Sequence, residues 1–224
     1  MEAHLSNGPA AVEDAAPQLS FAIVEGGVLE YAAVPTLRFG LRIETTRPVR
    51  SLILNVQLRI AATRRPYSDA ERERLVELFG GAQDWGRNLR SLHWTNVAVQ
   101  VGPFSDTTLV EVPVTCTYDL EVTASRYFNG LADGEIPLEF LFGGTVFFGG
   151  ADGRLQVRPI SWNQEADFRL PVSAWRELIE RHFPGQAWLR LDRGAFERLS
   201  AYRARHTLLS WGETVDSLLP ERES

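Results

Sequence analysis

The segment Ile136–Phe148 most strongly limits the folds that this chain can adopt, because it is apolar on both faces of an extended strand. One face carries Leu138, Phe140, Phe142, Val146 and Phe148. The other face carries Leu141 and Phe147. A strand with two apolar faces has to be covered on both of them. We therefore expect Ile136–Phe148 in the centre of a β-sheet.

Two consecutive glycines, Gly143 and Gly144, interrupt this segment. Glycine weakens a strand and often marks a bulge or the close approach of a neighbouring backbone. A bend in a packed strand is the interpretation that we favour. The alternative is a pocket in which a small ligand rests on the bare backbone.

Alternation of apolar and polar residues predicts further strands. They are expected at Leu19–Val24, Pro35–Thr46, Val49–Ala61, Leu92–Val101, Leu109–Thr115, Tyr118–Thr123, Arg154–Ile160 and Ala166–Leu170. The turn at Arg47-Pro48 leads us to expect that the second and third of these strands pair antiparallel. The Asp152-Gly153 turn after Phe148 predicts a hairpin into the strand that follows.

Helix signals fall in two internal stretches and in the C-terminal part of the chain. Ser68 and Glu71 have the spacing of a capping box, and Gly80-Gly81 ends the helix that they begin. A second short helix is expected at Ala124–Leu131. After residue 170 the apolar period becomes that of amphipathic helices. The expected N-caps of these later helices are Ser173, Asp192 and Ser210.

The order of strands first and helices afterwards predicts an α+β fold. We expect a mostly antiparallel sheet or sandwich, with one inserted helix and a C-terminal helical segment packed on it. The expected organisation is a disordered leader over 1–18, a β-rich domain over 19–170 with its helical insertion near 68–80, C-terminal helices over 171–219 packed on the same domain, and a frayed tail over 220–224.

Composition excludes several classes of function. All 23 basic residues are arginine, so the chain has no lysine for a Schiff base or for a phosphate-binding loop. The net charge of −6 argues against nucleic-acid partners. The single cysteine, Cys116, excludes an intrachain disulfide. Apolar runs are too short for a membrane span and the N-terminus does not resemble a secretion signal, so we expect a cytoplasmic protein.

The sequence contains no recognisable catalytic, cofactor or metal site. The four histidines are scattered, and motifs of the type G-x-S-x-G and G-x-G-x-x-G are absent. Cys116 occupies a position that should be apolar, so we predict a buried, inert thiol. A catalytic cysteine would need a base, and His93 is the one candidate for that role.

Two features of the sequence suggest surfaces for a partner protein. Arginines are in excess between residues 190 and 205, and a cluster of this kind can dock an acidic partner. These arginines are Arg190, Arg193, Arg198, Arg203 and Arg205. Trp85 and Trp162 fall in predicted loops, where an exposed indole can anchor a partner. The alternative for the arginines is an ordinary solvated helix face.

Several short motifs carry a resemblance to a known group of sequences. They are Ala33-Val34-Pro35-Thr36-Leu37, Arg64-Arg65-Pro66-Tyr67-Ser68, Trp85-Gly86, Cys116-Thr117-Tyr118-Asp119, Asp133-Gly134-Glu135-Ile136-Pro137-Leu138, Gly144-Thr145-Val146-Phe147, Phe183-Pro184-Gly185 and Trp188-Leu189-Arg190-Leu191. Through them the chain resembles an uncharacterised bacterial domain-of-unknown-function family over residues 19 to 219. Members of that family look like genomic neighbours of high-affinity uptake nickel–iron hydrogenases. A weaker similarity over Arg126–Phe148 is to the bacterial preprotein-export chaperone.

The resemblance and the missing catalytic motifs together favour a non-enzymatic accessory protein. Its expected partner is another protein, such as a hydrogenase subunit or a maturation factor. A first alternative is a chaperone-like holdase that uses an apolar groove near Phe140–Phe148. A second alternative is a small-ligand-binding protein, or an unrecognised enzyme, with a pocket near Gly143-Gly144.

Overall fold

A computed structural model describes residues 16–117, 119, 122–161, 163–186 and 190–219. The expected tail over 220–224 and all but three residues of the expected leader over 1–18 lie outside the described residues. The chain divides into two compact units. We call Met1–Gln186 the sandwich unit and Ala187–Ser224 the C-terminal unit, and each is described by itself. No helix within the described residues is both long and apolar enough to cross a membrane.

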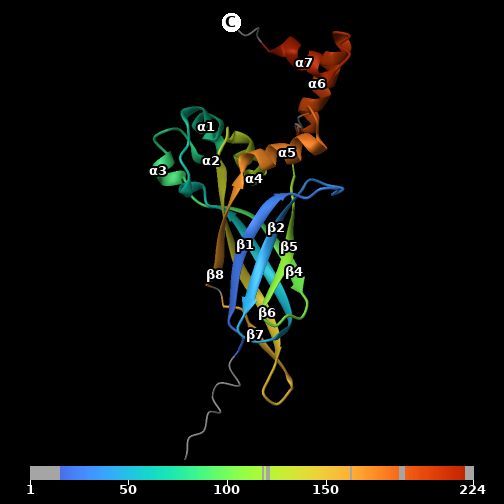
Figure 1. Cartoon of the computed structure of the whole chain (residues 1–224). Helices are drawn as coiled ribbons and strands as arrows, with labels where there is room; N and C mark the ends of the chain where they lie inside the picture. Colours follow the sequence, from blue (N-terminus) through green and yellow to red (C-terminus); the bar gives the residue numbers. More distant parts are fainter. Residues whose placement is uncertain (1–15, 118, 120–121, 162, 187–189, 220–224) are drawn as a thin grey trace, which may run out of the picture. The chain divides into compact units, whose positions relative to one another are not determined.

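The sandwich unit contains two antiparallel sheets (Figure 1). Sheet A has the order β1-β2-β5, formed by β1 (Leu19–Val28), β2 (Thr36–Thr45) and β5 (Thr107–Thr115). Sheet B has the order β4-β3-β6-β7, formed by β4 (Leu92–Val101), β3 (Val49–Ile60), β6 (Glu135–Gly149) and β7 (Leu155–Pro159). A further strand, β8 (Gln164–Pro171), also pairs with β6. The predicted α+β fold is confirmed.

The two sheets bury their apolar faces against each other. Phe39 of β2 lies with its ring centroid 5.0 Å from that of Phe140 of β6, in an edge-to-face arrangement. Phe21 of β1 stacks on Phe142 of β6 at 4.5 Å. Aromatic pairs of this geometry add to the stabilisation that burial of apolar area provides. Alternate residues of β2, β3 and β6 therefore form one continuous core.

β6 has the central position that its two apolar faces predict. It pairs with β3 along one edge and with β7 and β8 along the other. The expected close backbone approach is found at Gly144, whose φ is 129°. A Cβ atom at Gly144 would lie 2.0 Å from the carbonyl oxygen of Ile53, so only glycine fits there. Gly144 thus lies at a close backbone approach within a packed strand.

The expected pairing of β2 with β3 is wrong. β2 has β1 and β5 as its neighbours, whereas β3 has β4 and β6. The turn that contains Arg47-Pro48 carries the chain from sheet A to sheet B instead of forming a hairpin. Both strands have a strongly apolar inner face, and crossing between the sheets lets these faces pack against each other.

Short helices gather at one end of the sandwich (Figure 1). They are η1 (Ala62–Arg64), α1 (Asp69–Arg74), α2 (Val76–Phe79), α3 (Trp85–Asn88), α4 (Thr123–Gly130) and α5 (Val172–His182). The capping box of Ser68 and Glu71 is confirmed at the start of α1. Ser173 does not cap α5, because β8 runs directly into the helix and Pro171 occupies the N-cap position. The strand expected at Tyr118–Thr123 lies partly outside the described residues, and α4 begins at its last residue.

The C-terminal unit consists of α6 (Arg193–Arg205) and α7 (Trp211–Leu218). Both helices begin where the sequence predicts. The Asp192 carboxylate accepts a hydrogen bond from the backbone N–H of Ala195 at 2.8 Å. The Ser210 hydroxyl accepts one from the backbone N–H of Glu213 at 3.1 Å. Such caps satisfy helix-terminal N–H groups that otherwise have no intrahelical partner.

Candidate interaction surfaces

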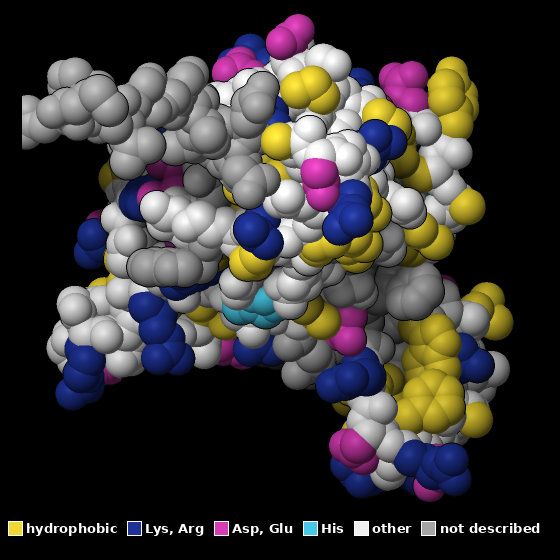
Figure 2. Space-filling model, turned by 90° about the horizontal axis from the view of Figure 1, so that it is seen from below, with side chains coloured by type: hydrophobic (Ala, Val, Ile, Leu, Met, Phe, Trp, Pro, Cys, Tyr) yellow, Lys and Arg dark blue, Asp and Glu magenta, His cyan; other side chains and the backbone are white. Residues whose placement is uncertain are grey.

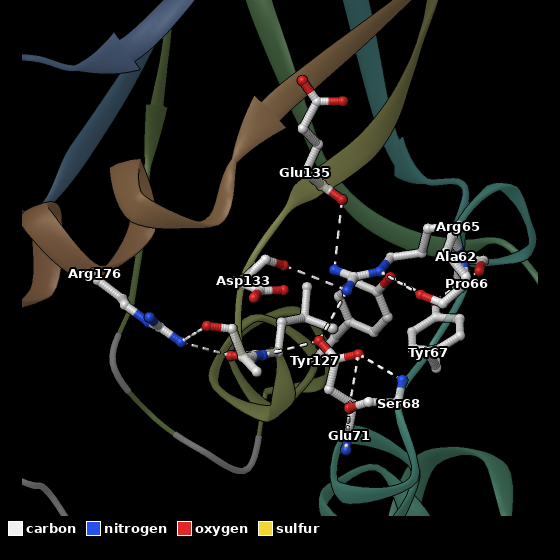
Figure 3. Close-up of polar contacts among 12 residues, drawn as sticks. Ala62, Arg65, Pro66, Tyr67, Ser68, Glu71, Tyr127, Asp133, Glu135 and Arg176 are labelled. Carbon is white, nitrogen blue, oxygen red and sulfur yellow. Dashed lines mark hydrogen bonds and ion pairs between the residues drawn. The ribbon is translucent and has the colours of Figure 1, made fainter.

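A buried ion pair lies at the helical end of the sandwich (Figure 3). Arg65 Nη2 lies 2.8 Å from Glu71 Oε1, and only 7% and 4% of the two side chains are exposed. The Glu71 carboxylate also accepts hydrogen bonds from the backbone N–H of Ser68 at 3.0 Å and of Ala132 at 2.9 Å. The Arg65 guanidinium donates in turn to the carbonyl of Glu135 at 3.4 Å. A buried charge pair needs such additional hydrogen bonds to offset its desolvation.

Two tyrosines continue this polar network. The hydroxyl of Tyr67 donates to the carbonyl of Ala62 at 2.6 Å, and it lies 2.7 Å from the hydroxyl of Tyr127. Because Tyr67 uses its proton on Ala62, Tyr127 is the donor in the pair of hydroxyls. Burial raises the pKa of Tyr67 to about 12 and also raises the pKa of Tyr127. Both hydroxyls therefore stay protonated at neutral pH.

The polar network fastens the helical end of the sandwich to β6. It joins the segment that leads into α1 with the loop between α4 and β6, which are more than 60 residues apart in the sequence. A surface cleft of about 470 Å³ adjoins the network and is lined by Arg65, Pro66, Tyr67, Ser68, Asp133, Gly134, Glu135 and Arg169. The Arg65 and Glu71 charges are already occupied by each other and by backbone groups, so we interpret the network as structural.

Cys116 is buried, as predicted, with 7% of its surface exposed. Its thiol donates a weak hydrogen bond to the carbonyl of Val114 at 3.4 Å. Burial raises the pKa of this thiol to about 12, so the reactive thiolate is scarce at neutral pH. Across the described part of the chain, no group of three His, Cys, Asp or Glu side chains is placed to hold a metal ion.

The expected exposure of Trp85 is wrong. This residue begins α3 and is 8% exposed. Its indole N–H donates to the carbonyl of Gly80 at 3.1 Å, and its ring packs on Phe79 at 5.3 Å and on Tyr67 at 5.1 Å. The segment after Gly80 folds back as a helical turn, and this turn directs the indole into the core. The second predicted anchor, Trp162, lies outside the described residues.

The apolar groove near Phe140–Phe148 that a holdase would need is not open. Phe140, Phe142 and Phe148 are between 0% and 2% exposed. Sheet A covers them, because their side chains point into the sandwich. Only the side chains on the other face of β6, such as Leu141 and Phe147, are partly exposed.

The structure separates the predicted arginine cluster into parts with different surroundings. Arg203 lies over the ring of Trp211, with its guanidinium carbon 4.1 Å from the ring centroid. At about 3.6 residues per turn, Phe196 and Leu199 fall on the same face of α6 as Arg203. By the same spacing, Arg198 and Arg205 fall on the far side of the helix. Arg190 is exposed before α6 begins, and Arg193 is exposed at its first residue.

An apolar groove lies between α6 and α7, with a cavity volume of about 510 Å³. It is lined by Leu191, Phe196, Leu199, Trp211, Gly212, Val215 and Asp216. Phe196 is 49% exposed, Trp211 39% and Val215 42%. On the face that Figure 2 displays, hydrophobic side chains gather in patches bordered by arginines. Sequence reasoning found the arginines and the apolar stripe of α6 but not this groove, because the groove depends on how α7 packs against α6.

Comparison with known proteins identifies a family for this chain. Residues 16–224 match a family model described as "Family of unknown function (DUF6084)". No curated protein matches the chain. The structure is similar to a CARDB domain from Pyrococcus furiosus, solved with di-metal ions, at a TM-score of 0.28 and 13% identity, over 71% of this chain and 94% of that one.

A second similar structure is a beta-glucosidase from Kluyveromyces marxianus. The TM-score is 0.27 and the identity 10%, over 69% of this chain. The matched region spans 15% of the glucosidase. At TM-scores this low, neither structure bears on the function of this chain.

Proposed function

The chain belongs to a family of unknown function, DUF6084, and we propose that it is a non-enzymatic protein that binds a partner protein through the groove between α6 and α7. One observation carries this proposal: among the described residues of α6 and α7, every hydrophobic side chain remains at least partly exposed, and Thr214 alone is buried. Exposed apolar surface rimmed by polar residues marks interaction sites. Helices of this length are also marginal without tertiary packing.

The occupant that fits the α6–α7 groove is an amphipathic helix of the partner. A groove between two helices takes the apolar face of a third helix through residues spaced three and four apart. Arg203 on the Trp211 ring and Asp216 in the lining supply one charge of each sign. A partner helix with a carboxylate and a basic side chain beside its apolar stripe can pair with both, and this fixes its direction.

The partner that we propose is a nickel–iron hydrogenase subunit or a protein of hydrogenase maturation. This choice rests on the sequence resemblance to a family whose members look like neighbours of hydrogenase genes. The protein acts, in this proposal, in the cytoplasm and contributes a binding surface rather than a reaction.

The test is affinity purification of the tagged full-length chain from its native host, followed by mass spectrometry. Three versions are compared: the wild type, Val215→Glu in the groove, and Leu209→Glu as a matched control. Leu209 is 87% exposed and does not line the groove. We expect a hydrogenase subunit or maturation factor with the wild type and with Leu209→Glu, and its loss with Val215→Glu.

Two results would contradict the proposal in different ways. Recovery of no hydrogenase component with any version would remove the hydrogenase assignment. Equal recovery with Val215→Glu and the wild type would remove the groove as the binding site. Circular dichroism of the purified variants shows whether Val215→Glu keeps the helical content of the wild type.

A further inference from the structure

The outward faces of the two sheets differ sharply in charge. On sheet A, Arg38 of β2 lies 3.1 Å from Glu25 of β1 and 3.1 Å from Glu111 of β5. Arg42 of β2 lies 3.4 Å from Glu44 of the same strand. All these side chains are more than a third exposed, so the outer face of sheet A is an ordinary solvated, ion-paired surface.

The outer face of sheet B is uncharged over most of its length. Burial alternates along β3 and β6, so the odd-numbered residues from 51 to 57 and from 141 to 147 point outward. We call this surface the neutral face. Its members are Ser51, Ile53, Asn55 and Gln57 on β3, Leu141, Gly143, Thr145 and Phe147 on β6, Asn96, Ala98 and Gln100 on β4, and Val157 and Pro159 on β7. Ile53 is 51% exposed and Val157 46%.

Charged side chains lie at the borders of the neutral face: Glu165 of β8 stands opposite Leu141, and Arg50 lies beside Gly149 at the end away from the helices. Others lie at the end nearest the helices. There Arg59 lies 3.9 Å from Glu139, and Arg64 lies 2.9 Å from the same carboxylate. In a chain with 23% charged residues, a run of uncharged side chains across the centre of four neighbouring strands is unusual. Solvated strand faces normally carry charges, as sheet A does, so the neutral face has the character of a surface that is covered.

We propose that the neutral face packs on the same face of a second copy of this chain, as a two-fold symmetric dimer. Two-fold symmetry brings a patch against itself, so the patch must be self-complementary. The centre of the neutral face can meet its own copy without burying a charge, with Glu165 and Arg50 left at the border, whereas sheet A would bury Arg38 and Arg42. The net charge of −6 opposes association of two copies wherever acidic side chains would meet.

The size of the neutral face is sufficient for a small specific interface. The face takes seven residues each from β3 and β6, five from β4 and three from β7, and at about 3.3 Å per residue and about 4.8 Å between strands it covers roughly 350 Å² per copy. Two copies give roughly 700 Å² of projected area, and the relief of the side chains brings the buried total to the low end of specific interfaces. The assignment is independent of the α6–α7 groove, because the neutral face belongs to the sandwich unit.

Gly143 lies in the middle of the neutral face and provides the test. Gly143 pairs with Asn55 of β3, and Asn55 pairs in turn with Ala98 of β4. Because glycine and alanine have little or no side chain, the centre of the face lies lower than its surroundings. Nothing in the described chain lies within 4 Å of the position that a Gly143 Cβ would take. A side chain added there therefore projects outward without disturbing the fold.

The experiment is sedimentation analysis of the full-length chain at micromolar concentrations, for the wild type, Gly143→Arg and Ile53→Arg. Leu109→Arg is the matched control, since Leu109 is 61% exposed on β5 of sheet A. We expect the wild type and Leu109→Arg at twice the chain mass of 25.1 kDa. Gly143→Arg and Ile53→Arg should weaken the dimer by about 100-fold or more, because each brings two like charges into the buried interface.

Three outcomes would overturn the assignment. The first is a wild type that stays monomeric at every concentration. The second is a dimer that Gly143→Arg and Ile53→Arg leave unchanged. The third is a dimer that dissociates with Val215→Glu in the α6–α7 groove but not with Gly143→Arg. Thermal unfolding of each variant, compared with the wild type, separates dissociation from loss of the fold.

Discussion

The guanidinium of Arg65 lies 2.8 Å from the carboxylate of Glu71, and neither side chain is more than 7% exposed. The carboxylate also accepts hydrogen bonds from Ser68 at the start of α1 and from Ala132 in the loop before β6. The Glu71 side chain therefore caps α1, neutralises the buried charge of Arg65 and ties two distant segments together. Removal of either charge would leave the other buried without an opposite charge.

The first prediction concerns the loss of this carboxylate. Glu71→Ala should lower the free energy of unfolding by about 3–5 kcal/mol, since Arg65 is left as an uncompensated buried charge. Urea unfolding followed by circular dichroism measures the change. Glu73→Ala on the exposed side of the same helix is the control and should stay within about 0.5 kcal/mol of the wild type. Equal effects of the two substitutions would show that the ion pair does not hold the helical end.

The second prediction is a loss of stability in acid that depends on Glu71. Burial alone would raise the pKa of this carboxyl, but hydrogen bonds from Ala132 and Ser68, with the Arg65 charge, hold the pKa below its usual value of 4.5. A folded-state pKa below the unfolded one stabilises the fold above the unfolded pKa. This contribution is lost as pH falls below 4.5 and through the folded pKa. The free energy of unfolding should fall less steeply below that pH in Glu71→Gln, and parallel slopes would contradict the assignment.

The third prediction compares the two adjacent glycines of β6. Gly144→Ala places a methyl group against the Ile53 carbonyl and forces alanine into a positive φ, at a cost of about 2–4 kcal/mol. Gly143→Ala adds a methyl group in open space, and it should stay within about 1 kcal/mol of the wild type or stabilise the strand. Chemical unfolding of the two variants in parallel measures the contrast. Equal effects of the two substitutions would contradict the contrast.

The fold was predictable wherever a local pattern decides it. The period-2 alternation of β2 and β3 and the capping box of Ser68 and Glu71 depend only on neighbouring residues. The pairing partners of a strand do not depend only on neighbouring residues. Apolar and polar residues alternate in the same way whether two consecutive strands form a hairpin or lie in opposite sheets of a sandwich. A short turn such as Arg47-Pro48 is compatible with either arrangement, and only the packing of the two apolar faces decides between them.

The candidate surfaces were predictable only in part for the same reason. Sequence reasoning located Arg203 but not its stacking on Trp211, which depends on the packing of α7 against α6. It placed Trp85 in a loop because the apolar period is too short there to indicate α3. The sequence contains one indication of the Arg65–Glu71 pair, which is that Glu71 belongs to the predicted capping box. Its bond to Ala132 spans 61 residues and leaves no local trace.

The fourth prediction concerns the reactivity of Cys116. A pKa raised from 9.0 to about 12 lowers the thiolate fraction near neutral pH by about 1,000-fold. Burial of the sulfur slows the reaction further. Alkylation of the native protein by iodoacetamide at pH 8 should therefore be at least about 100-fold slower than alkylation of the urea-unfolded chain. Similar rates in the two states would show that Cys116 is accessible and activated in the fold.

The last prediction concerns the dynamics of the C-terminal unit. The described hydrophobic side chains of α6 and α7 remain partly exposed, whereas those on the inner face of β3 are covered by sheet A. Backbone hydrogen bonds without a buried apolar core open at low free energy, so their amides exchange quickly with solvent. Hydrogen–deuterium exchange of the isolated protein should show α6 and α7 exchanging orders of magnitude faster than β3 and β6. Binding of a partner helix should slow the exchange of α6 and α7 and leave β3 unchanged. Protection of α6 and α7 equal to that of β3 in the isolated protein would mean that the groove is already covered, and the groove would then not be available to a partner.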